Sequence, residues 1–73
     1  MDKTIYTEEH RAIVQRLIKA RQESGLKQED VAKLLNRTQS FVSKVEAGQK
    51  RIDVVELKEL ARIYNKPLGF FIT

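Results

Sequence analysis

The sequence has no cysteine and no tryptophan, and it holds one proline, three glycines and one histidine among its 73 residues. Without cysteine, the chain has no disulfide, no thiolate zinc ligand and no cysteine nucleophile. The single histidine, His10, has no convincing set of carboxylates beside it, so we expect no metal site. Three glycines form no glycine-rich phosphate loop. The composition therefore argues against an enzyme and gives no sign of a cofactor.

Long apolar runs are missing as well. No segment approaches the roughly 20 apolar residues of a membrane span, and residues 1–6 have no apolar run of the kind found in signal peptides. We therefore expect a cytoplasmic protein with no membrane partner and no evident small-molecule ligand. Since cores begin to split only near about 250 residues, residues 1–73 are expected to form a single domain.

Positive charge is concentrated in the middle of the chain. The net charge is +4, from 14 basic and 10 acidic residues. Residues 27–51 carry six basic and three acidic side chains, which is +3, against +1 for residues 1–26 and zero for residues 52–73. A basic patch attracts phosphate, which is the sequence-independent part of DNA affinity. Charge alone fits a mildly basic protein without a nucleic-acid partner equally well.

Apolar residues recur at helical spacing between short breaks. Residues suited to N-caps (Thr7, Thr38, and Asp53 with Glu56) precede the helical runs, and residues that tolerate a left-handed backbone (Gly25, Asn36, Gly48) follow them. The pattern predicts an all-α fold of about five helices, at Glu8–Ser24, Gln28–Leu35, Gln39–Ala47, Val54–Tyr64 and Leu68–Ile72. The expected buried faces include Leu34 in the second helix and Val54 in the fourth.

Residues 28–45 fit the pattern of a helix-turn-helix. Counted from Gln28, position five is the small Ala32, where the second helix must cross closely, and position nine is Asn36, which accepts positive φ. Inward positions four, eight, fifteen and eighteen are the apolar Val31, Leu35, Val42 and Val45. The joint match favours a helix-turn-helix at about residues 28–47 over an ordinary helical hairpin.

The run LKQEDVAKLLNRTQSFVSKVEAGQKRIDVVELKELARIYNKPL resembles the phage repressor and Cro family of helix-turn-helix regulators, also called the XRE family. The resemblance covers about residues 10–70 and implies a compact, lambda-repressor-like DNA-binding domain. Two positions depart from the family pattern, since Asn36 stands where glycine is usual and Lys27 where a capping residue is frequent. The markers are Gln28, Ala32, the pair Gln39-Ser40, the run Val45-Glu46-Ala47-Gly48, and the helix with Leu57, Leu60 and Ala61.

The resemblance implies that helix 39–47 lies in the major groove. Positions matching the base-reading residues are Gln39, Ser40 and Lys44, whose side chains suit adenine and guanine edges, and Ser43 lies next to them. Residues expected to contact phosphate, and so to position the protein without reading sequence, are Gln28, Arg37, Thr38, Lys50 and Arg51. For the last two, a plain solvated pair is the alternative.

The resemblance also assigns structural roles. It implies a partly buried ion pair between Arg21 and Glu46, which link the first and third helices. Phe41 is expected to pack under the turn, with contact to a DNA sugar as the alternative. The apolar tail is expected to supply a two-fold interface through Phe70, Phe71 and Ile72, with folding back onto the core as the alternative.

We therefore expect a sequence-specific DNA-binding transcriptional regulator that acts as a repressor. As a homodimer it would bind a double-stranded operator with paired half-sites. An antitoxin-type regulator that also binds a protein toxin is the first alternative. A helical adaptor that binds protein and no DNA is the second.

Overall fold

The computed structural model describes residues 7–72, which form four α-helices and one turn of 3-10 helix, with no strand in that range. The elements are α1 (Glu8–Glu23), α2 (Gln28–Leu35), α3 (Gln39–Glu46), α4 (Val54–Ile63) and η2 (Leu68–Phe70). The all-α prediction is confirmed, but the expected fifth α-helix is the short η2. None of the helices in residues 7–72 is long and apolar enough to cross a membrane.

Side-chain caps begin three of the four α-helices where the sequence predicts them. The Oγ1 atoms of Thr7 and Thr38 each accept a hydrogen bond of 3.1 Å from the backbone N–H three residues on. At the start of α4, Asp53 Oδ1 accepts from the Glu56 N–H at 2.7 Å, and Glu56 Oε1 accepts from the Asp53 N–H at 3.1 Å. These caps satisfy helix N–H groups that have no partner within the helix.

Helix α2 begins at Lys27, whose ammonium group cannot accept a hydrogen bond. Asp30 compensates from inside the first turn, because its Oδ2 accepts from the Lys27 N–H at 2.9 Å. A carboxylate there also suits the positive end of the helix dipole. The start of α2, where the sequence lacks a side chain that can act as N-cap, is thus stabilised by Asp30.

The turn between α2 and α3 depends on a left-handed residue. Asn36 has φ 60° and ψ 42°, as the sequence predicts. Its conformation lets the Arg37 N–H donate back to the Ala32 carbonyl at 2.9 Å, which closes the end of α2. The reversal of the chain at Asn36 brings α3 directly against α2.

We expect Asn36→Gly to leave the stability nearly unchanged, whereas Asn36→Val should lower the free energy of unfolding by about 1–2 kcal/mol, because a β-branched residue is strained at positive φ. Urea denaturation followed by circular dichroism measures both. Asn65, with φ 58° after α4, is a matched control where the same two substitutions should behave alike. A valine tolerated at position 36 but not at 65 would contradict the left-handed turn.

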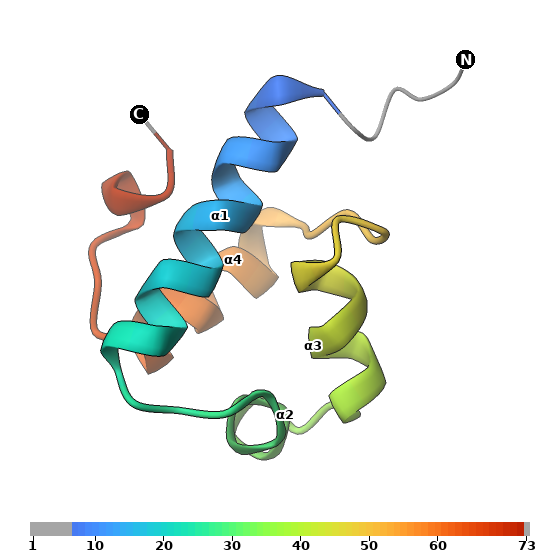
Figure 1. Cartoon of the computed structure of the whole chain (residues 1–73). Coiled ribbons are helices and arrows are strands. Elements are labelled where there is room, and N and C mark those ends of the chain that lie inside the picture. Colours follow the sequence, from blue (N-terminus) through green and yellow to red (C-terminus); the bar gives the residue numbers. More distant parts are fainter. Residues whose placement is uncertain (1–6, 73) are drawn as a thin grey trace.

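The core lies where the four α-helices meet, with α1 in front of α4 and α3 to one side (Figure 1). Helix α3 packs against both α1 and α2, and α2 also contacts α4. The buried residues that form one continuous cluster are Leu17, Ala20, Val31, Ala32, Phe41, Val42, Val45, Leu57, Leu60, Ala61, Tyr64 and Phe71. Every element except η2 contributes to this cluster, so the fold is held mainly by apolar packing.

Two residues expected in the core lie on the surface. Leu34 is 62% exposed and Val54 is 64% exposed. Helix α2 buries Val31 and Ala32, and Leu34 lies about 100° around the helix from Leu35, on the side that α3 and α4 leave open. Val54 is the first residue of α4, and the buried stripe of that helix begins one turn later at Leu57.

The apolar tail folds back onto the core. The Phe71 side chain is fully buried, and the Phe71 carbonyl accepts a hydrogen bond of 3.3 Å from an Arg16 guanidinium N–H of α1. The Phe70 ring meets the Phe71 ring edge-on, with centroids 5.1 Å apart. The prediction of Phe71 as a dimer contact is therefore wrong, because burying an apolar ring in so small a core is strongly favourable.

Candidate nucleic-acid interface

Helix α3 presents a polar face outward and an apolar face inward. Phe41, Val42 and Val45 are buried against the other helices. The burial of Phe41 agrees with the prediction that it packs under the turn. The side chains on the opposite face are all exposed, and they are the predicted base-reading residues Gln39, Ser40 and Lys44 with Ser43 beside them.

A shallow hollow lies at the start of α3. It brings together several residues predicted separately as phosphate and base contacts, and Phe41 lies among them. Its lining is Asn36, Arg37, Thr38, Ser40, Phe41, Lys44 and Lys50. Three cationic side chains and two hydroxyl groups around one concave surface are suited to phosphate oxygens.

Four predicted contact residues do not line this hollow. Gln39 and Ser43 are exposed on α3, and the other two are Arg51 and Gln28. Arg51 is exposed and lines a separate hollow beside the start of α1, together with Thr7, Glu9, His10, Ile13 and Ile52. Gln28 is partly buried at the start of α2. The structure therefore does not bring Arg51 or Gln28 into the hollow at the start of α3.

Arg37 makes contacts that the sequence analysis missed. Its guanidinium carbon lies 4.0 Å from the centre of the Phe41 ring, and the Lys50 ammonium lies 5.6 Å from the same ring. An Arg37 guanidinium N–H also donates to Glu56 Oε2 of α4 at 3.2 Å. The spacing of Arg37 and Phe41, four residues apart across the cap, is a detectable signal. The contact between Arg37 and Glu56 of α4 cannot be predicted from neighbouring residues, because the two are far apart in the sequence.

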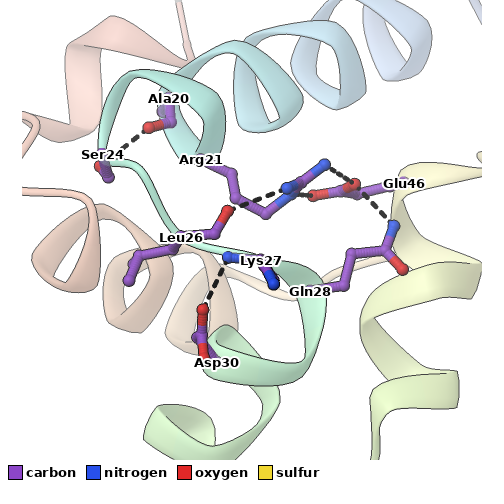
Figure 2. A network of polar contacts seen from close by, with 8 residues as sticks. All are labelled: Ala20, Arg21, Ser24, Leu26, Lys27, Gln28, Asp30 and Glu46. Carbon is purple, nitrogen blue, oxygen red and sulfur yellow. Dashed lines mark hydrogen bonds and ion pairs between the residues drawn. The ribbon is translucent and has the colours of Figure 1, made fainter.

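A polar network joins the helix-turn-helix to α1 (Figure 2). Two N–H groups of Arg21 donate to the two Glu46 carboxylate oxygens, at 2.7 and 3.1 Å, and a third donates to the Leu26 carbonyl at 3.0 Å. Gln28 Nε2 donates to Glu46 Oε1 at 2.9 Å. The predicted ion pair between Arg21 and Glu46 is thus present, and it extends to α2.

The pKa of Arg21 in this network and the pKa of Tyr64, which the Glu46 charge also affects, are both raised. The hydrogen bond from Arg21 to Glu46 raises the pKa of the guanidinium, although partial burial opposes the shift. Burial raises the pKa of the Tyr64 hydroxyl, and the Glu46 charge adds to the effect. Arg21 is therefore charged and Tyr64 neutral at physiological pH, so neither group makes the position of α3 sensitive to pH.

Comparison with known proteins bears directly on this arrangement. A family model described as helix-turn-helix matches residues 17–71, which run from the middle of α1 through the tail. The chain belongs to the helix-turn-helix family. Within it, the match supports a Cro- and repressor-like regulator of the XRE type, as the sequence resemblance implies. Neither the curated proteins nor the solved structures gave a match.

Membership of the helix-turn-helix family assigns the general function. The protein is a DNA-binding transcriptional regulator, and its family is a family of regulators and not of enzymes. All residues predicted to contact DNA lie between positions 28 and 51, inside the matched range of 17–71. The helix-turn-helix regulator therefore carries its candidate DNA surface entirely within the part that identifies the family.

Proposed function

We propose that this helix-turn-helix regulator binds a two-half-site operator as a homodimer, with α3 in the major groove, and that it represses transcription by occupying the operator. The observation that carries the proposal is the division of α3 into a buried apolar face and an exposed polar face. The exposed polar face of α3 lies beside a hollow lined by Arg37, Lys44 and Lys50. Side chains that suit base edges and side chains that suit phosphates therefore occur together on one surface.

The exposed face of α3 suggests how bases would be read. Gln39 can donate and accept at one adenine edge, and Lys44 can donate to the guanine acceptors, each with discrimination of about 1–3 kcal/mol. Ser40 and Ser43 are short and can bond to several base edges. Two serines among four reading positions favour modest direct readout, so DNA shape and half-site spacing would add much of the specificity.

Phosphate contacts would position the protein on the duplex. The exposed candidates are Arg37, Thr38, Lys50 and Arg51, which flank α3. Gln28 uses one amide proton for Glu46. Its backbone N–H belongs to the first turn of α2, and the N–H groups at the N-terminus of a helix can bind an anion such as phosphate. Such contacts would supply affinity that depends on salt but not on sequence.

The dimer would form through apolar side chains of the C-terminal tail that remain at the surface. Ile72 is 50% exposed and Phe70 is partly buried against the core, so both can contribute apolar area to a partner. A two-fold dimer of this kind places its reading helices about 34–36 Å apart, which is one turn of DNA. Phe71 is excluded from the interface because its side chain is fully buried.

Selection of bound duplexes from a random pool tests the proposal. We expect a pseudo-palindromic site, since each half-site is read by one protomer. Gln39→Ala and Lys44→Ala should each relax the preference at one base pair per half-site and weaken specific binding by about 1–3 kcal/mol. Lys58→Ala is the matched control, because Lys58 is an exposed cation on α4 outside the reading surface. Unchanged base preference in both α3 variants would show that another surface reads the DNA.

An antitoxin would share the DNA-binding surface and differ by also binding a toxin. No contact among residues 7–72 specifically favours that reading. Co-purification of a stoichiometric protein partner encoded beside the regulator would support it.

A further inference from the structure

The Arg37 side chain is held on two sides, although it lies in the turn before α3. One face of its guanidinium lies on the Phe41 ring, with 4.0 Å between the guanidinium carbon and the ring centre. One edge points to α4, where a terminal N–H donates to Glu56 Oε2 at 3.2 Å. Stacking on a ring and donating from the edge are compatible, because the guanidinium is planar.

Glu56 is itself held in place. Its Oε1 accepts from the Asp53 N–H at 3.1 Å, while its own N–H donates to Asp53 Oδ1 at 2.7 Å. One carboxylate oxygen therefore caps α4 and the other holds Arg37. The orientation of the Arg37 guanidinium is consequently linked to the backbone at the start of α4, a helix whose Leu57, Leu60 and Ala61 lie in the core.

We propose that Glu56 is a positioning residue for DNA binding, which acts by holding the Arg37 guanidinium flat on Phe41. The inference rests on the proposed function of the α3 surface. Glu56 receives one of the five guanidinium N–H donors. Arg37 also lines the hollow with Thr38 and Lys50, where a DNA phosphate would accept from the donors that Glu56 leaves unused. A side chain held in its bound conformation loses less rotamer freedom on binding than a mobile one.

The same contacts allow the opposite behaviour, in which Glu56 withholds Arg37 from DNA. The geometry favours positioning, because a phosphate can bind to the unused donors without breaking the bond to Glu56. The two possibilities predict opposite signs for the coupling between Glu56 and Arg37 in DNA affinity. A double-mutant cycle measures that sign directly.

The cycle consists of wild type, Glu56→Gln, Arg37→Gln and the double variant. Glutamine keeps an oxygen that can cap α4 and removes the charge that holds Arg37. The probe is a fluorescently labelled random-sequence duplex titrated at several salt concentrations, since phosphate contacts do not depend on sequence. Any general effect of the Glu56 charge, or of the cap, is the same in both backgrounds and cancels in the cycle.

We expect Glu56→Gln to weaken binding by about two- to five-fold more when Arg37 is present than when it is glutamine, as an exposed ion pair allows. Arg37→Gln should reduce the salt slope by about one counterion. Arg37→Lys, which keeps the charge but cannot stack and donate in the same way, should retain the slope and lose the coupling to Glu56. In wild type without DNA, the Arg37 Nε–H resonance should show the ring-current shift of Phe41, and Glu56→Gln should reduce it.

Zero coupling, or stronger binding by Glu56→Gln only when Arg37 is present, would overturn the positioning role while leaving DNA binding intact. An unchanged Arg37 resonance in Glu56→Gln would overturn it as well. A wild-type protein that shows no salt-dependent binding to the duplex would instead refute the proposed function, and the inference would be refuted with it.

Discussion

Phe71→Ala is expected to lower the free energy of unfolding by about 3–5 kcal/mol, because truncating a buried phenylalanine removes apolar burial and leaves a cavity. The Phe71 side chain is fully buried and belongs to the same cluster as Leu17 and Leu60. Since single domains are stable by only about 5–15 kcal/mol, the loss takes a large share of the total. Urea denaturation with a circular-dichroism signal at the helical wavelength measures it.

Ile72→Ala is the matched control for this prediction. The two residues are adjacent, but the Ile72 side chain is 50% exposed. We expect its truncation to change the stability by no more than about 0.5 kcal/mol, and to weaken the dimer in sedimentation velocity if Ile72 contacts the partner. A Phe71→Ala protein of unchanged stability that fails to dimerise would return Phe71 to the interface and contradict the folded-back tail.

Glu46→Gln is expected to cost about 2–3 kcal/mol, because it leaves the Arg21 charge without its partner in a partly buried site. The side chains of Arg21 and Glu46 are only 16% and 7% exposed. Glutamine preserves the shape and one acceptor. Its oxygen can replace Oε1, which accepts from both Arg21 and Gln28, but its NH2 group then stands where Oε2 accepted from the Arg21 Nε–H, so two donors face each other. The measurement is the same denaturation experiment, with wild type and variant compared at equal protein concentration.

Glu23→Gln tests whether the stability loss expected for Glu46→Gln comes from the burial of the ion pair or from the short distance between its charges. The Glu23 carboxylate lies 2.9 Å from the Lys66 ammonium, yet the Glu23 side chain is 46% exposed. The hydrogen bond and charge of Lys66 lower the pKa of Glu23, but water and salt screen such a pair. We expect no resolved change in stability for Glu23→Gln. Equal losses in the two variants would contradict the role of burial in the Glu46 network.

The elements that sequence predicts well here are those with local signals. Thr7, Thr38 and the Asp53–Glu56 pair begin helices at the expected positions, and Asn36 adopts the expected left-handed conformation. Each of these features depends on residues no more than four apart. The exposed face of α3 follows from the same periodicity, since the burial of Val42 and Val45 determines which side chains point outward.

Other features depend on contacts between distant residues and have no local sign. The burial of Phe71 depends on α1 and α4 leaving a space that the tail can fill. The bond between Arg37 and Glu56 joins residues 19 apart in the sequence. Leu34 fits a helical stripe as well as Leu35 does, and only the packing of α2 against its neighbours places one outside and the other inside.

The polar network centred on Glu46 affects how the DNA preference of such a regulator can change during evolution. Glu46 bonds to side chains from α1 and α2, and the core holds α3 through Phe41, Val42 and Val45. The exposed residues Gln39, Ser40, Ser43 and Lys44 belong to neither group. Under the proposed function, target preference and folding stability therefore reside in different side chains of one short helix. Exchange of the four exposed residues would then offer a route to a new operator on an unchanged scaffold.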